Sequence, residues 1–154
     1  MTDHGAFVPA DFNPPTQLSA GELRLEPLGP EHNERDYAAW TSSMDHIRSS
    51  PGYGTDKEWP RDMSLDDNRR DLERHADDFR TRKGFTYTVL DADDVVVGCV
   101  YVYPAKDDVH DALVQSWVRE SEAEHDLDLR QAVADWLTGE AWPFTRPLYE
   151  PLLS

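Results

Sequence analysis

Residues 84–103 read GFTYTVLDADDVVVGCVYVY, and this stretch decides the fold. β-branched and aromatic residues dominate both halves, which suits β-strands, and the acidic DADD at 91–94 between them is typical of a turn. Residues 112–119 (ALVQSWVR) form a third run of the same character. The pattern therefore predicts three consecutive antiparallel strands at 84–90, 95–103 and 112–119.

A helix is predicted directly after the third strand. Ser121 and Glu124 stand in the spacing of a capping box, in which a serine and a glutamate bond the first amides of a helix. Apolar residues at helical spacing follow at Leu127, Leu129, Val133, Trp136 and Leu137. A strand that ends at a helix N-terminus commonly forms an anion site, because unpaired backbone N–H groups point outward there.

This order of elements resembles the GNAT superfamily of acyl-coenzyme A dependent N-acetyltransferases, in particular the branch that acetylates ribosomal-protein N-termini and small amines. The resemblance is carried by Gly98 in the second strand, by the third strand ending in Trp117-Val118-Arg119, and by the helix after it. The upstream run LRLEPL at 23–28 is similar to the opening strand of that branch. The resemblance covers residues 22–138. It implies an α/β domain with a central, mostly antiparallel mixed sheet flanked by helices and abbreviated at its C-terminal end.

The resemblance also implies a function and a site. An enzyme of this kind would transfer acetyl from acetyl-coenzyme A (acetyl-CoA) to an amine, with Glu120 as the general base at the end of the third strand. The residues expected at the coenzyme are Trp117, Val118, Arg119, His125, Asp126 and Leu127. The residues expected to line the acceptor pocket are Asp45, His46, Tyr53, Trp59 and Tyr101.

The segment 120–128 departs from the family pattern. The family places Arg or Gln, two residues, Gly, one residue and Gly or Ala here, whereas this chain reads ESEAEHDLD, with no glycine and five carboxylates. Acids in a first helical turn complement the helix dipole, but they would repel a pyrophosphate. Acetyl-CoA is therefore disfavoured, and a second hypothesis stands beside the enzyme: a GNAT-fold binding or interaction protein that has lost the coenzyme.

The chain is predicted to hold an extended N-terminal arm at 1–21 and one domain at 22–154. Apolar residues at helical spacing between 30 and 48 predict a helix in which Trp40 belongs to the core, and Ser64 is predicted to cap a second helix. After Gly139 three prolines leave room for no more than a short edge strand. An open edge and apolar flank would be covered by a homodimer or by the arm, and the side chains available for this are Phe7, Phe12, Trp142 and Phe144.

Composition limits the partners. The 154 residues carry 31 acidic and 15 basic side chains, a net charge of −16, which disfavours nucleic acids and anionic membranes. The acidity is consistent with an amine or a basic partner and equally with a solvated surface suited to a high-salt cytoplasm. The sequence shows neither an apolar run of membrane-spanning length nor a basic and apolar leader, so a cytoplasmic protein is expected. Cys99 lies in an apolar run and is predicted to be a buried thiol. The acidic clusters at 107–111 and 125–128 resemble ordinary turns and helix starts, and no metal site is predicted.

Overall fold

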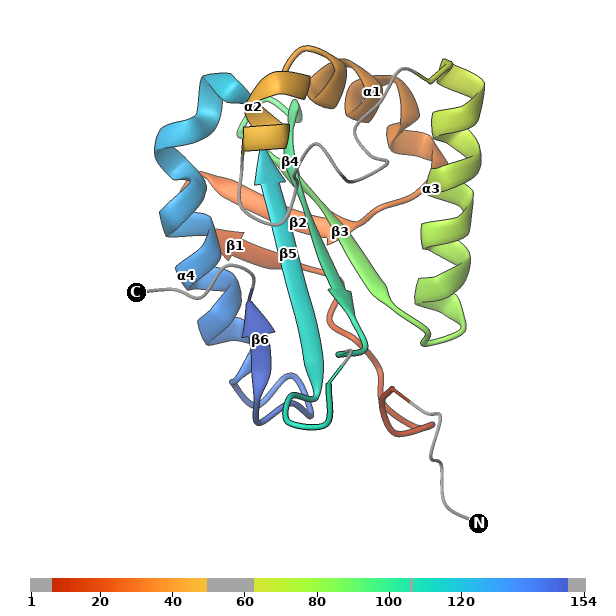
Figure 1. Ribbon diagram of the computed structural model, residues 1–154, viewed down its shortest axis with the longest axis vertical. Coiled ribbons are helices and arrows are strands. Elements are labelled where there is room, and N and C mark those ends of the chain that lie inside the picture. Colours follow the sequence, from red (N-terminus) through yellow and green to blue (C-terminus); the bar gives the residue numbers. More distant parts are fainter. Residues whose placement is uncertain (1–6, 50–62, 106, 150–154) are drawn as a thin grey trace.

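A computed structural model describes residues 7–49, 63–105 and 107–149 as one sheet with helices on both faces (Figure 1). The strands are β1 (Leu18–Ala20), β2 (Leu23–Pro27), β3 (Phe85–Leu90), β4 (Val96–Tyr103), β5 (Ala112–Val118) and β6 (Pro147–Tyr149). They lie in the order β1-β2-β3-β4-β5-β6, with antiparallel neighbours except for the parallel pair β5 and β6.

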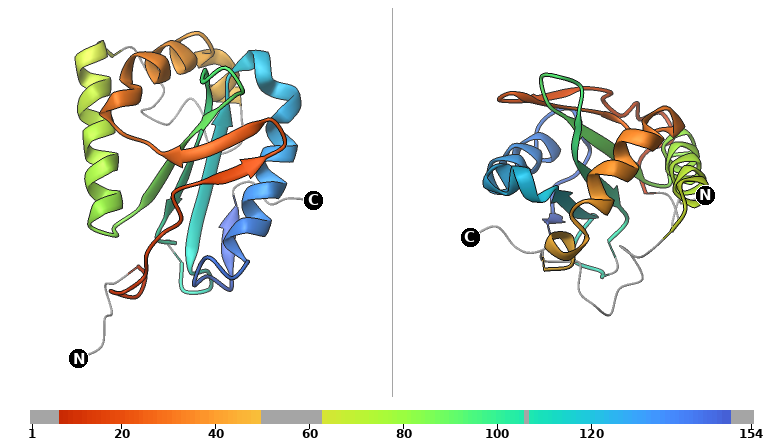
Figure 2. Two further views of the ribbon diagram at one scale, coloured as in Figure 1. Left: turned by 180° about the vertical axis from the view of Figure 1, so that it is seen from behind. Right: turned by 90° about the horizontal axis from the view of Figure 1, so that it is seen from above.

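The helices divide between the two faces. They are the 3-10 turn η1 (Pro30–His32), α1 (Asn33–Thr41), α2 (Met44–Ser49), α3 (Leu65–Arg80), the 3-10 turn η2 (Glu120–His125) and α4 (Asp126–Leu137). Seen from above, α4 lies on one side of the sheet and α1 and α3 on the other (Figure 2). The sheet thus separates two cores.

The three predicted strands are confirmed as β3, β4 and β5, paired antiparallel with Tyr87 opposite Val100 and Val100 opposite Ser116. Gly98 has a packing reason. A Cβ at this position would lie 2.4 Å from the carbonyl oxygen of Trp117 on β5, closer than non-bonded atoms approach, so the glycine allows the two strands to pair beside the end of β5.

The arm covers the sheet face that carries α4. Phe7 stacks on Phe85 and Phe144 with ring centroids 5.8 and 5.3 Å away, and Phe12 lies 5.4 Å from Trp142. Part of the predicted arm joins the sheet, since residues 18–20 form β1. The arm therefore supplies the predicted cover, while the homodimer stays a prediction.

The opposite face holds the second core. Trp40 and Ile47 are fully buried here with Leu72, Cys99 and Trp117, which confirms the core assignment of Trp40. Burial raises the pKa of the Cys99 thiol well above its ordinary value. The predicted helix at 30–48 is divided into η1, α1 and α2.

The two predicted helix caps differ in outcome. The capping of α3 is confirmed, because the Ser64 hydroxyl accepts the amide of Asp67 at 3.0 Å. The capping box at Ser121 and Glu124 is wrong: the segment forms η2, and neither η2 nor α4 begins with a side-chain cap bond. The 3-10 turn instead bonds its own backbone, with the Glu122 amide donating to the Arg119 carbonyl at 2.8 Å.

Candidate functional site

The end of β5 uses its backbone amides internally. The Arg119 amide donates to the Val97 carbonyl at 2.8 Å, and the Glu120 amide donates to the Ser43 hydroxyl at 2.9 Å. With the Glu122 amide bonded to Arg119, three amides at this strand end point at protein acceptors. A side chain from the turn between α1 and α2 thus occupies one of the donors that an anion would need.

The side chains of this segment are mostly solvated. Glu120, Glu124 and Asp128 are exposed, and Leu127 is 54% exposed. The Arg119 guanidinium donates to the Val96 carbonyl at 3.4 Å and to the Ser42 hydroxyl at 3.3 Å.

Asp126 and His125 of this segment have neighbours on α4 and at the β1–β2 turn. Asp126 lies 3.3 Å from Nε of the buried Arg130. His125 lines a groove of about 450 Å³ between the β1–β2 turn and α4. Carboxylates dominate its polar rim, which includes Glu22, Asp91, Glu122 and Asp128.

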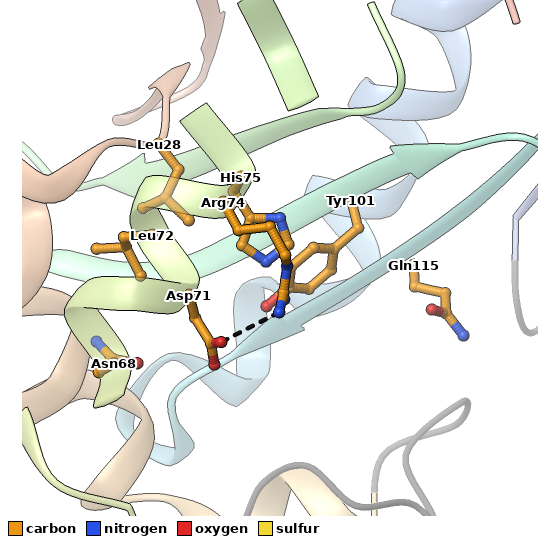
Figure 3. A pocket seen from close by; sticks show the side chains of 8 residues that line it. All are labelled: Leu28, Asn68, Asp71, Leu72, Arg74, His75, Tyr101 and Gln115. Atoms are coloured by element: carbon orange, nitrogen blue, oxygen red, sulfur yellow. Dashed lines mark hydrogen bonds and ion pairs between the residues drawn. The ribbon is translucent and has the colours of Figure 1, made fainter. Parts of the chain in front are cut away.

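A second cavity, the α3 pocket, lies on the opposite face of the sheet. It has a volume of about 230 Å³ and is lined by Leu28, Asn68, Asp71, Leu72, Arg74, His75, Tyr101 and Gln115. α3 supplies five of these residues, and β4 and β5 supply Tyr101 and Gln115 (Figure 3). An ion pair of 3.2 Å between Asp71 and Arg74 lies beside His75 and Tyr101.

His75 is held by a chain of hydrogen bonds. Its Nδ1 lies 2.9 Å from the Tyr103 hydroxyl and 3.0 Å from Oγ1 of Thr86. The Tyr103 hydroxyl in turn donates to Asp78 at 2.9 Å. Burial, with a smaller contribution from the Arg74 charge, lowers the pKa of His75 to about 4. His75 is therefore a neutral imidazole at neutral pH.

A buried carboxylate lies beneath the pocket. Nδ2 of Asn68 donates to Asp36 at 3.1 Å, and its Oδ1 accepts Nε1–H of Trp40 at 3.1 Å. Burial raises the pKa of Asp36 to about 6, against the opposing effect of the Asn68 bond. The contact between α1 and α3 thus buries Asp36 in an apolar core, next to Asn68 in the pocket wall.

Solved structures resemble this arrangement. The ribosomal-protein-S5-alanine acetyltransferase from Vibrio fischeri superposes with a TM-score of 0.60 at 13% identity, over 80% of this chain and 68% of that one. An acetyltransferase from Salmonella typhimurium that modifies the N-terminal serine of ribosomal protein L7/L12 gives 0.60 at 12%, over 77% and 64%. The microcin C7 self-immunity acetyltransferase MccE, in complex with acetyl-CoA and AMP, gives 0.62 at 14%, over 80% and 67%. The chain has the GNAT acetyltransferase fold.

The similarity to these solved structures establishes the fold of the chain. No family model and no curated protein matches the sequence. Within the described residues, no helix is long and apolar enough to cross a membrane. In the same parts of the chain, no three His, Cys, Asp or Glu side chains form a group that could hold a metal ion.

The 120–128 segment does not fit the coenzyme pyrophosphate in the way the resemblance implies. Such a fit needs free backbone amides and a close approach to the helix start. Here the Arg119, Glu120 and Glu122 amides have protein acceptors, and the segment carries five carboxylates. Those three amides are therefore not available to a phosphate in this structure.

The predicted coenzyme residues do not share one surface. Trp117 is buried on the α3 side, where its Nε1 donates to the Tyr101 hydroxyl at 2.9 Å, and Val118 is buried in the core on the α4 side. Alternation along the strand explains this, since successive side chains point to opposite faces.

The predicted acceptor residues are divided as well. Tyr101 lines the α3 pocket. Asp45 is exposed and His46 half-buried on α2, and neither lines that pocket. Tyr53 and Trp59 lie outside the described residues.

Sequence reasoning missed His75. One signal could have found it: His75 follows Leu72 by three residues and precedes Phe79 by four, which places it on the apolar face of α3. A histidine among core residues needs a hydrogen-bond partner, and here Tyr103 and Thr86 provide it.

Proposed function

We propose that this protein is an N-acetyltransferase that transfers acetyl from acetyl-CoA to an amine. The GNAT fold carries the proposal, because the similar structures are named acetyltransferases. Acetyl-CoA would supply the acetyl group as a thioester. Two features of the chain support an amine acceptor. The α3 pocket beside β4 and β5 offers a place for it, and the net charge of −16 attracts cations. Glu120, exposed after β5, is the proposed general base, and Glu120→Gln tests it.

We expect acetyl-CoA to bind weakly at low salt. The exposed carboxylates of residues 120–128 repel the coenzyme phosphates, and salt screens such repulsion, with a Debye length of about 10 Å at 0.1 M and about 3 Å at 1 M. Affinity should therefore rise with KCl, which is opposite to the usual behaviour of phosphate ligands on basic sites.

The second candidate is a GNAT-fold binding protein that has lost the coenzyme and retains recognition of a partner. One observation favours it: the amides of Arg119, Glu120 and Glu122 already have protein acceptors. A site whose amides are occupied by hydrogen bonds differs from a site weakened by charge repulsion, because added salt screens the repulsion but does not free the amides.

Calorimetry separates these candidates. We would titrate acetyl-CoA at 0.1, 1 and 3 M KCl, with S-acetylpantetheine as the matched probe that lacks the phosphates, and assay acetyl transfer to a panel of primary amines. Salt-enhanced binding of acetyl-CoA together with turnover supports the enzyme. Absence of binding and of turnover at every salt concentration removes the enzyme and leaves the binding protein.

A further inference from the structure

The hydrogen bonds around His75 determine its tautomer. A carboxylate only accepts hydrogen bonds, and a tyrosine hydroxyl has one proton. Because Tyr103 donates that proton to Asp78, its oxygen can only accept from His75. The Thr86 hydroxyl donates to Tyr103, so its oxygen, 3.0 Å from Nδ1, is also left to accept. Burial raises the pKa of Tyr103, so the phenol keeps its proton. Nδ1 of His75 therefore carries the ring proton, and Nε2 is left with a lone pair.

Nε2 is the ring nitrogen available to a ligand. His75 lines the α3 pocket, and both hydrogen bonds of its ring nitrogens with described residues use Nδ1. An unprotonated Nε2 accepts a hydrogen bond and cannot donate one. It therefore favours a ligand that presents an N–H or O–H group and disfavours a carboxylate.

Charge and size narrow the ligand further. The two charged residues that line the pocket, Asp71 and Arg74, form an ion pair. Two further carboxylates lie behind the lining, with Asp36 bonded to Asn68 and Asp78 bonded to Tyr103. This balance favours a positively charged ligand. A volume of about 230 Å³ holds about eight waters at about 30 Å³ each, so it admits a short chain or the end of a longer one.

We propose that the α3 pocket binds the amino group of an unbranched primary alkyl amine and that Nε2 of His75 accepts a hydrogen bond from its nitrogen. Leu28 and Leu72 provide apolar contacts for the alkyl stem. Asp78 and Tyr103 are positioning residues that hold the imidazole in the accepting tautomer. The role of this pocket as the acceptor site of an enzyme rests on the proposed function, whereas binding of the amine itself requires no acetyl-CoA.

NMR of the imidazole nitrogens tests the proposal on the full chain without coenzyme. Before any ligand is added, we expect the His75 spectrum of a neutral ring protonated at Nδ1. n-Butylamine hydrochloride should then shift the Nε2 signal saturably, n-butanol should bind about tenfold more weakly, and sodium butyrate should leave the signal unmoved at matched ionic strength. A ring protonated at Nε2, or butyrate binding as tightly as butylamine, overturns the proposal.

Two variants extend the test. His75→Gln should reduce butylamine affinity at least about tenfold, and His110→Gln, a change outside the pocket, should leave it unchanged. Tyr103→Phe keeps the ring but removes the oxygen, so His75 should show a mixture of tautomers and bind butylamine several-fold more weakly. Unchanged affinity in folded His75→Gln contradicts the proposal, and so does an unchanged tautomer in Tyr103→Phe.

The outcome is independent of the enzyme assay. If butylamine binds through His75 but acetyl transfer is absent, the amine site stands and the enzyme proposal fails. If acetyl transfer occurs with amines while the His75 signals and the His75→Gln affinity are unaffected, the acceptor lies elsewhere and this inference fails alone.

Discussion

The α3 pocket and the 120–128 segment both have carboxylates in or near them, but these groups differ in their exposure to solvent. In and beneath the pocket, burial raises the pKa of Asp36 and lowers that of His75, so both groups are pushed toward their neutral forms. At 120–128, Glu120, Glu124 and Asp128 are exposed to solvent. Burial, rather than acidic composition, therefore determines which region of this molecule forms hydrogen bonds in fixed directions and which contributes only a long-range electrostatic field.

The largest effect is expected at Gly98, which pairs with Val118 at the end of β5. Gly98→Ala would place Cβ 2.4 Å from the Trp117 carbonyl. Because backbone atoms must move, we expect a loss of about 2–4 kcal/mol of unfolding free energy, measured by urea denaturation. Gly139→Ala is the control, since its Cβ meets nothing closer than 3.4 Å. Equal stability of both variants would contradict the close approach.

Asp36 tests the buried side through pH. Its pKa is raised to about 6, so its contribution to stability is complete below pH about 3.8 and is lost as pH rises through 6. Asp36→Asn stays uncharged, and we expect it to be more stable than the parent by about 1–2 kcal/mol at pH 8. The gain should vanish at pH 4. Thermal or urea unfolding at both values checks this, and a pH-independent difference would refute the charge explanation.

Ser43 connects the turn between α1 and α2 to the 120–128 segment, because its hydroxyl accepts the Glu120 amide across 77 residues of sequence. Ser43→Ala should cost about 1 kcal/mol through the lost hydrogen bond. It also releases one amide at the end of β5. If occupied amides limit coenzyme binding, calorimetry should show acetyl-CoA affinity rising in Ser43→Ala and not in the neighbouring Ser42→Ala; no change in either variant points to charge instead.

The smallest effect concerns the half-buried Glu122 and the exposed Glu124. Glu122→Gln with Glu124→Gln should strengthen acetyl-CoA binding about two- to fivefold at 0.1 M KCl and have little effect at 1 M, where surface charges are screened. The pair Glu34→Gln with Glu73→Gln removes the same net charge from α1 and α3. Equal gains from both pairs would show that total charge, and not the 120–128 segment, controls affinity.

Local patterns predicted much of the fold and less of the site. The β-branched runs identified β3, β4 and β5 with bounds that differ by no more than one residue, and Ser64 marked the start of α3. The capping box at Ser121 failed because the segment forms the 3-10 turn η2, in which Ser121 lies inside the turn and Arg119 is the N-cap. Tyr101 was predicted to line a pocket, whereas His75 was overlooked because its partners lie on β3 and β4.

By itself the sequence determined the strands, most of the helices and the sign of the surface charge. These follow from side-chain periodicity and composition, which act between near neighbours. Only the tertiary structure decided which amides at the end of β5 remain free, which nitrogen of His75 carries its proton and where Asp36 is buried. Each of these depends on partners many residues away, since hydrogen bonding and desolvation are set by whatever the fold brings within a few ångströms.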